Sequence, residues 1–177
     1  YPSKQNASWI NKDQILIGAD FGDGTMNESG YPMQVKLWNR GEALEEAKIF
    51  FSGSYEKIFN FPFVSIRPDG EYYGIIEGPT FFSKVLHLFD GETLIKVDLP
   101  KMIEIHGFFR DSLILTIEED WGIFSSGSLL EIDVNSAMTN SIDESDVTVI
   151  FEPDGKRFIS GVSIGKNQLM VSMLENV

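Results

Sequence analysis

Cysteine is absent from the 177-residue sequence, and histidine occurs only twice. The absence of cysteine excludes a disulfide framework, a cysteine nucleophile, a cysteine-ligated iron–sulfur cluster and a thiolate zinc site. Long apolar runs are also missing. No stretch approaches the roughly 20 residues that a membrane-spanning helix requires, and nothing resembles a signal peptide.

Positive charge is scarce, because 14 Lys and Arg stand against 27 Asp and Glu and leave a net charge of −13. A surface this acidic repels phosphate backbones and anionic lipids, so neither nucleic acid nor a membrane is predicted as a partner. The hydrophobic content of 42% supports a folded core. The sequence starts with Tyr1 instead of Met and stops at Val177 after a strand-like run. We therefore expect a segment of a longer protein.

Helical periodicity is scarce as well, and only residues 41–47 and 135–140 predict a helical turn or two. Elsewhere, short runs rich in Ile, Val, Phe, Tyr and Leu alternate with turn sequences such as Pro68-Asp69-Gly70 and Asp90-Gly91. This pattern predicts an all-β chain. The predicted strands are 14–19, 33–38, 48–51, 61–66, 72–77, 81–89, 93–99, 103–108, 113–118, 128–133, 147–151, 158–163 and 169–173.

Short strands spaced in this way are typical of a sandwich, a barrel or a propeller. An internal repeat helps to choose, because residues 11–18 resemble residues 165–172, and the same turn followed by an apolar run recurs at 68–75 and 110–115. We interpret these as four copies of the first hairpin of a four-stranded blade. The repeat favours a β-propeller over a sandwich. We predict a fragment of about three and a half antiparallel blades within one propeller domain, residues 1–177. The predicted blades are 7–52, 61–99, 103–152 and an incomplete one at 158–177.

Gly161-Val162-Ser163-Ile164-Gly165 has the G-x-S-x-G pattern of a hydrolase nucleophile elbow. That motif requires a strand that turns sharply into a helix, whereas the residues after Gly165 predict a turn and another strand. Both histidines, His87 and His106, precede the motif, although hydrolases of this type place their histidine after the serine. We interpret Ser163 as a hairpin residue and predict no catalytic residue in the chain.

A long loop connects the first two predicted strands and contains the carboxylates Asp20, Asp23 and Glu28. Their spacing does not match the EF-hand pattern, and no second oxygen-rich segment accompanies them, so we predict no metal and no cofactor. Long ordered loops often carry function. We therefore predict that Asp20, Asp23 and Glu28 belong to a docking loop. The alternative is that this loop only closes its own blade.

Other conspicuous residues have simpler interpretations. His87 lies in an alternating strand and His106 near a strand end, and two isolated histidines make no convincing metal site. The tryptophans Trp9, Trp38 and Trp121 are predicted to lie in the core between blades. The acidic run 118–120 is predicted to be a solvated loop.

Several segments together resemble the propeller domain of bacterial prolyl oligopeptidases, serine peptidases that cut short peptides after proline. The glycine-rich loop is the most specific of these segments, the similarity extends over the whole chain, and it is weakest at 52–101. The resembling segments are Ile17 to Met26, Ser29 to Pro32, Val35 to Gly41, His106 to Asp111 with Trp121, Gly127 to Leu130, and Leu174 to Val177.

The resemblance implies a two-domain enzyme in which an α/β-hydrolase domain with a Ser-Asp-His triad is capped by a propeller that admits only peptides. The expected partners are the protein's own C-terminal α/β-hydrolase domain and proline-containing peptides. No position in this chain matches the triad, so the hydrolase domain is not expected here. A cytoplasmic location is expected, with a periplasmic one as the alternative.

A non-enzymatic propeller that acts as a binding or scaffold module is the main alternative function, because propellers host many unrelated activities. A carbohydrate-active β-domain would require paired carboxylates that converge on a cleft, and the sequence identifies no such pair. What distinguishes the first two hypotheses is whether a hydrolase domain follows the propeller.

Overall fold

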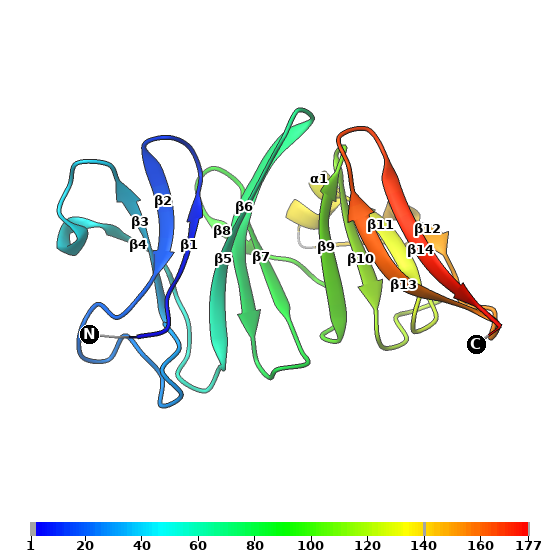
Figure 1. The fold of residues 1–177 in the computed structure, drawn as a ribbon, viewed down its shortest axis with the longest axis horizontal. Coiled ribbons are helices and arrows are strands. Elements are labelled where there is room, and N and C mark those ends of the chain that lie inside the picture. The colour runs from blue at the N-terminus through cyan, green and yellow to red at the C-terminus, as the bar shows by residue number, and fades with distance from the viewer. Residues whose placement is uncertain (1–2, 140, 177) are drawn as a thin grey trace. The chain divides into compact units, whose positions relative to one another are not determined.

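The computed structural model describes residues 3–139 and 141–176 of the chain (Figure 1). Two predictions concern other positions, Asn140 at the end of the predicted helical turn and Val177 at the end of the resemblance, and these lie outside the described residues. The chain forms two compact units. Unit 1 contains the residues up to 66 together with 72–94, and unit 2 contains 67–71 and 95–177.

The described residues form four β-sheets and very little helix, and in each sheet the strands follow one another in chain order. Three sheets have four strands and the last has two. Every strand pair with a described register is antiparallel. The first sheet contains β1 (Asn6–Trp9), β2 (Gln14–Gly18), β3 (Gln34–Asn39) and β4 (Lys48–Ser52), with the 3-10 helix η1 (Leu44–Glu46) before β4.

The second sheet contains β5 (Phe59–Arg67), β6 (Gly70–Gly78), β7 (Val85–Phe89) and β8 (Leu94–Lys96). The third contains β9 (Ile103–Phe109), β10 (Ser112–Ile117), β11 (Leu129–Asp133) and β12 (Val147–Phe151). The short helix α1 (Val134–Met138) and the 3-10 helix η2 (Glu144–Asp146) connect β11 to β12. The fourth sheet contains β13 (Arg157–Ile164) and β14 (Leu169–Glu175).

Alternation of apolar residues produces the core of unit 1. Leu16 on β2 and Val35 on β3 are fully buried and form one cluster with Ile75 of the second sheet. At their first strands the two sheets also share a polar contact, because the Ser8 hydroxyl on β1 donates to the Pro62 carbonyl on β5 at 3.0 Å. The strands β1 and β5 therefore lie side by side.

In unit 2, the central strand β10 is buried on both faces. Leu113, Ile114 and Leu115 are consecutive and all have an exposed fraction of 0%, which a strand with one solvated face does not allow. The first strands of the third and fourth sheets, β9 and β13, are neighbours.

The four predicted hairpins are all present. Their turns fall at 10–13, 68–69, 110–111 and 165–168, each between the first two strands of a sheet. The all-β class and the four-stranded antiparallel sheets predicted from the sequence are confirmed. The division into blades of one propeller domain stays a prediction.

Two local predictions are wrong. The strand predicted at 81–89 begins only at Val85, because the Thr80 and Ser83 side chains hydrogen-bond to each other at 2.8 Å and close a turn. Both Phe81 and Phe82 are exposed on this turn. Trp9, for which the sequence predicts a place in the core, has an exposed fraction of 51% in this chain.

Candidate functional site

The predicted docking loop connects β2 to β3 and spans residues 19–33 in unit 1. The strands β2 and β4 both run antiparallel to β3 and therefore in the same direction. The β2–β3 loop and the β4–β5 connection, residues 53–58, consequently emerge at the same end of the first sheet.

Thr25 fixes the first half of the loop. Its hydroxyl accepts a hydrogen bond from the Phe21 amide at 2.9 Å and donates to the Gly22 carbonyl at 2.7 Å. The carboxylate of Asp20 accepts the Gly22 amide at 3.0 Å, which is an Asx turn. Gly22 has a φ of 111°, which is accessible to glycine at no steric cost. This half of the loop is therefore ordered by its own side chains.

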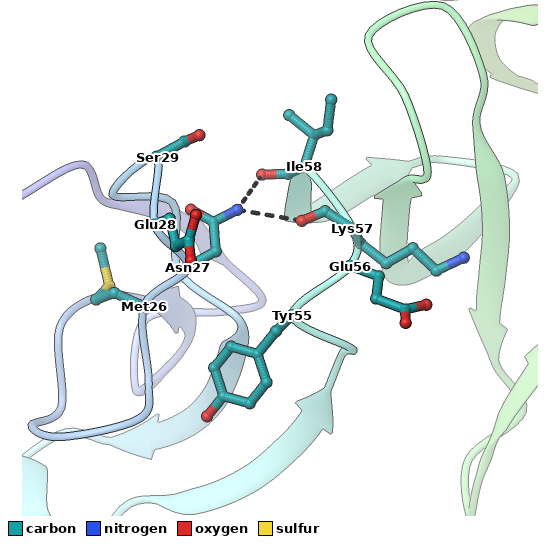
Figure 2. Close-up of a pocket in the computed structure, with 8 residues that line it drawn as sticks. All are labelled: Met26, Asn27, Glu28, Ser29, Tyr55, Glu56, Lys57 and Ile58. Atoms are coloured by element: carbon teal, nitrogen blue, oxygen red, sulfur yellow. Dashed lines mark hydrogen bonds between the residues drawn. The ribbon is translucent and has the colours of Figure 1, made fainter.

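Asn27 fixes the second half of the loop to the β4–β5 connection (Figure 2). Its side-chain amide donates to the carbonyls of Lys57 and Ile58 at 3.1 and 2.9 Å. Its side-chain oxygen accepts the Tyr31 amide at 2.9 Å. Both polar ends of the amide group are thus used, and one residue joins two loops that are distant in sequence.

Tyr55 adds a second link between the same two loops. Its hydroxyl donates to the carbonyl of Gly24. Gly24 has a φ of 79°, so the carbonyl is presented from a backbone conformation that favours glycine. No role was predicted from the sequence for Asn27 or Tyr55. The Asn-x-x-Gly-Tyr pattern at 27–31 was the available signal for the asparagine, because asparagine side chains cap tight turns.

Two pockets flank the loop. One of about 400 Å³ is lined by Met26–Ser29 of the loop and by Tyr55–Ile58 of the connection, and Glu28 belongs to it (Figure 2). The other, of about 590 Å³, contains Asp20 and Asp23 in its lining. The structure therefore places the three predicted docking carboxylates around two separate pockets and does not gather them at one point.

The carboxylates of the loop differ in their roles. Asp20 helps to fold the loop, as its hydrogen bond to the Gly22 amide shows. Asp23 and Glu28 are exposed and make no described side-chain hydrogen bond or ion pair. Within residues 3–139 and 141–176, no group of three or more His, Cys, Asp or Glu side chains is placed to hold a metal ion.

Both histidines lie on strands and contact neighbouring polar side chains. His87 on β7 places Nε2 at 3.5 Å from a carboxylate oxygen of Glu77, and both side chains are largely buried. The Nε2 atom of His106 on β9 lies 2.8 Å from the Thr116 hydroxyl on the neighbouring strand β10. These contacts agree with the predicted interpretation of both histidines as strand residues.

Ser163 lies within β13 and is paired with Met170 of β14. The chain therefore continues from the G-x-S-x-G pattern into a hairpin and not into a helix, so the geometry of a nucleophile elbow is absent at this serine. The interpretation of Ser163 as a hairpin residue is confirmed.

Carboxylates of the acidic run at 118–120 accept hydrogen bonds from the backbone. Glu119 accepts the backbone amides of Lys101 and Met102 at 2.7 and 2.9 Å, and Asp120 accepts the amide of Ser126 at 2.8 Å. Two of the three carboxylates thus order the backbone around them, whereas the prediction was a solvated loop.

Three carboxylates have a lowered pKa, and all three accept hydrogen bonds at turns. Backbone amides of Thr93 and Glu92 lower the pKa of Asp90. Those of Lys156 and Arg157 lower the pKa of Asp154. The pKa of Glu42 is lowered mainly by a hydrogen bond from the backbone amide of Asn39 and, to a smaller extent, by one from the Asn39 side chain. These shifts report turn geometry and do not mark a catalytic group.

Four antiparallel sheets, each with its strands in sequential order, define the class as a β-propeller fragment. Comparison with known proteins is consistent with this class. No protein-family model matches the chain. A search of curated proteins and one of solved structures both find peptidases.

Among curated proteins, an uncharacterized peptidase of Sinorhizobium fredii is 24% identical over 98% of this chain. An uncharacterized peptidase of Rickettsia prowazekii is 21% identical over 96% of this chain. In both cases the match covers 25% of the relative. The chain thus spans about a quarter of the length of the curated relatives that it matches.

Among solved structures, a post-proline cleaving enzyme from Rickettsia typhi matches 97% of this chain and 26% of its own, with a TM-score of 0.85 and 21% identity. A structure from a study of two prolyl endopeptidases matches 97% of this chain and 25% of its own, with a TM-score of 0.69 and 13% identity. The resemblance to part of a prolyl oligopeptidase and the predicted propeller-fragment fold are confirmed.

The helices among residues 3–139 and 141–176 are all too short to span a membrane.

Proposed function

We propose that this chain is part of the propeller of a serine-type peptidase that cleaves short peptides after proline, and that the propeller restricts which substrates reach the catalytic site. The observation that carries the proposal is the match of 97% of the chain, with a TM-score of 0.85, to about a quarter of a post-proline cleaving enzyme. The proposed partners are the protein's own α/β-hydrolase domain and proline-containing peptides.

The proposed contribution of this segment is steric. The described residues offer no nucleophile elbow, because Ser163 pairs within a hairpin, and the two histidines are engaged in strand contacts. The acyl-transfer chemistry is assigned to the hydrolase domain, where a serine, a histidine and an acid act together. The propeller would select peptides by size before they reach that triad.

Within this function we assign the β2–β3 loop to docking against the hydrolase domain or to the mouth of the substrate path. Asn27 and Tyr55 hold the loop to the β4–β5 connection. The exposed carboxylates of Asp23 and Glu28 are therefore presented from an ordered backbone, which keeps the entropy cost of an interaction low.

The test uses the full-length protein and a pair of fluorogenic peptides that differ only in proline or alanine before the scissile bond. Cleavage of the proline peptide alone, together with covalent labelling by a serine-reactive fluorophosphonate, is the expected result. A folded protein that carries the same proline sequence on its surface should remain uncut. Absence of both cleavage and labelling would overturn the peptidase proposal and favour a non-enzymatic binding module.

A further inference from the structure

A basic pocket in unit 2 is formed by turns that each connect the first two strands of a sheet. It has a volume of about 340 Å³ and is lined by Pro68, Asp69, Phe109, Arg110, Lys166 and Asn167. These residues come from three turns, those between β5 and β6, β9 and β10, and β13 and β14. The pocket is unusual for this chain, in which carboxylates outnumber cations by 27 to 14.

The charges in and beside the pocket do not cancel. Asp69 is compensated by Arg67, whose Nε atom lies 3.4 Å from its carboxylate. In the part of the chain that the structure describes, no ion pair connects Arg110 or Lys166 to a carboxylate. The side chains of Arg110 and Lys166 therefore leave an uncompensated positive charge at the pocket.

The frame around these two cations is ordered. The Arg67 guanidinium donates to the carbonyl of Gly165 at 2.6 Å and thereby holds the turn that carries Lys166. Both Arg67 and Arg110 lie near the ring of Phe109, at 5.9 and 5.1 Å from its centroid, within the range of a cation–π interaction. The Arg110 head group is thus positioned by an aromatic neighbour and not by a carboxylate.

The backbone supplies an independent observation. Arg110 has a φ of 54°, the left-handed conformation that costs an ordinary residue roughly 1 kcal/mol or more and that glycine adopts freely. In the other three turns between first and second strands, 10–13, 68–69 and 165–168, no residue has a positive φ. An arginine at this position is more costly for the fold than glycine would be, which indicates a role for its side chain.

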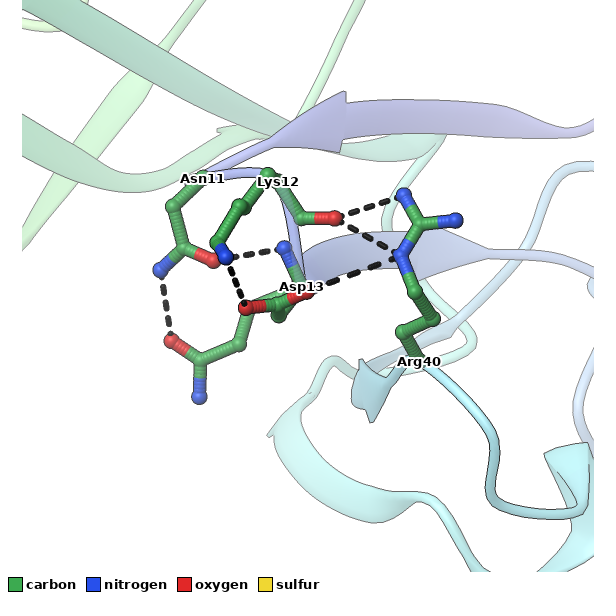
Figure 3. Close-up of polar contacts among 5 residues, drawn as sticks. Asn11, Lys12, Asp13 and Arg40 are labelled. Atoms are coloured by element: carbon green, nitrogen blue, oxygen red, sulfur yellow. Dashed lines mark hydrogen bonds and ion pairs between the residues drawn. The ribbon is translucent and has the colours of Figure 1, made fainter.

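The corresponding turn of unit 1 shows the contrast (Figure 3). Lys12 in the β1–β2 turn lies 3.7 Å from the carboxylate of Asp13, and Arg40 lies 3.6 Å from the same carboxylate. Arg40 also donates to the Lys12 carbonyl at 2.6 and 2.8 Å. There both cations pair with a carboxylate, whereas neither Arg110 nor Lys166 has a described ion pair.

We propose that Arg110 and Lys166 form a binding site for a peptide carboxylate. A guanidinium group matches the two oxygens of a carboxylate, and an ammonium group adds a second charge-assisted hydrogen bond. The Phe109 ring and Pro68 provide apolar contact for the side chain next to that carboxylate. A doubly charged anion such as phosphate is the alternative ligand, and the experiment below tests it as a competitor.

This site goes beyond the proposed peptidase activity and is tested without it. The probes are N-terminally fluorescent peptides that contain no proline, so that post-proline cleavage does not affect them. One has a free C-terminal carboxylate and no acidic residue, a second is amidated with one internal Glu, and a third is amidated without any acid. Inorganic phosphate serves as a competitor, and binding to the full-length protein is followed by fluorescence anisotropy.

We expect one or both carboxylate peptides to bind, and the neutral peptide to bind at least about tenfold more weakly. Binding of the first peptide alone assigns the site to a C-terminal carboxylate, and binding of the second alone assigns it to an acidic side chain. Equal binding of all three peptides, no binding at all, or displacement by phosphate at lower concentration than by carboxylate peptides would overturn the proposal.

Substitutions of Arg110 and Lys166 test whether the peptides bind at these residues. Arg110→Gly and Lys166→Gln should each raise the Kd about threefold or more, and the double variant about tenfold or more. Lys12→Gln is the matched control at the equivalent turn and should leave the Kd unchanged. Arg110→Gly removes the strained arginine, so its melting temperature should not fall. Weaker binding with retained stability therefore cannot result from misfolding, whereas unchanged binding in the double variant would refute the site.

Discussion

The side-chain amide of Asn27 donates to the carbonyl of Ile58 at 2.9 Å and so joins the β2–β3 loop to the start of β5. The same amide also donates to the carbonyl of Lys57, and the side-chain oxygen accepts the amide of Tyr31. Together with the hydrogen bond from the Tyr55 hydroxyl to the Gly24 carbonyl, these contacts hold the loop to the β4–β5 connection.

We predict that Asn27→Ala lowers the stability of the protein by about 1–3 kcal/mol, because two carbonyls lose their donor and one amide loses its acceptor. Thermal unfolding measures the global effect, and hydrogen exchange measures the local one. The amide of Tyr31 should exchange much faster in the variant. Asn135→Ala in α1, at an exposed asparagine, serves as the control. Unaltered protection of the Tyr31 amide would show that Asn27 does not order the loop.

The loop carboxylates provide a second prediction. Asp23→Asn combined with Glu28→Gln removes two exposed charges without loss of a described hydrogen bond. If the full-length protein has the proposed peptidase activity, we expect a rise of about threefold in KM for a proline peptide, or a faster proteolytic cut between the domains, because surface charges contribute modestly to docking. Asp20→Asn keeps an oxygen for the Gly22 amide and tests the third carboxylate separately. Unchanged turnover and unchanged proteolysis in all of these variants would leave the loop with a role only in its own sheet.

Gly74 on β6 offers the sharpest test of the packing in unit 1. It is paired with Leu88 on β7, and a Cβ atom at this position would overlap the carbonyl oxygen of His87. We expect Gly74→Ala to destabilise the protein by on the order of 3 kcal/mol, since the obstacle is backbone and cannot rotate away. Gly161→Ala is the matched control, because a Cβ added there would meet no atom within 4 Å and the φ of Gly161 is not positive. Equal melting temperatures for the two variants would contradict this account.

The sequence predicted the strands of the structure well wherever turn chemistry and alternation agreed. The hairpin at 103–117 illustrates this, because a two-residue turn at 110–111 separates two apolar runs. Phe81 and Phe82 misled the prediction, since aromatic residues favour strands and the hydrogen bond between Thr80 and Ser83 overrides that preference. The prediction that Trp9 lies in the core was wrong for another reason. Whether a tryptophan is buried depends on whether another part of the molecule covers it, and the residue type alone does not decide this.

The candidate site was predictable only in part. The unusual length of the β2–β3 loop and its carboxylates were visible in the sequence, but the separation of Asp20 and Glu28 around two pockets was not. The Arg110 and Lys166 pocket combines three turns that are each more than forty residues from the next in the sequence. Such a pocket forms only because the sheets bring these turns together, so no short stretch of the sequence predicts it.

Acid should destabilise the protein through its turns. The pKa of Asp154 is lowered by the backbone amides of Lys156 and Arg157, and that of Asp90 by the backbone amides of Thr93 and Glu92. A carboxylate whose pKa is lower in the folded than in the unfolded state adds stability that is complete above its unfolded pKa. This stability is lost as the pH falls through the folded pKa.

The double variant Asp90→Asn with Asp154→Asn tests this contribution, because asparagine keeps an oxygen that accepts backbone amides at a turn but does not titrate. At neutral pH the variant should melt below the wild type, since a neutral acceptor forms weaker hydrogen bonds than a carboxylate. As the pH falls through the acidic range, the difference between the two melting temperatures should shrink, because the wild type loses its charge and the variant has none at these positions to lose. A difference that stays constant from neutral pH to about pH 2 would mean that these two carboxylates do not couple folding to protonation.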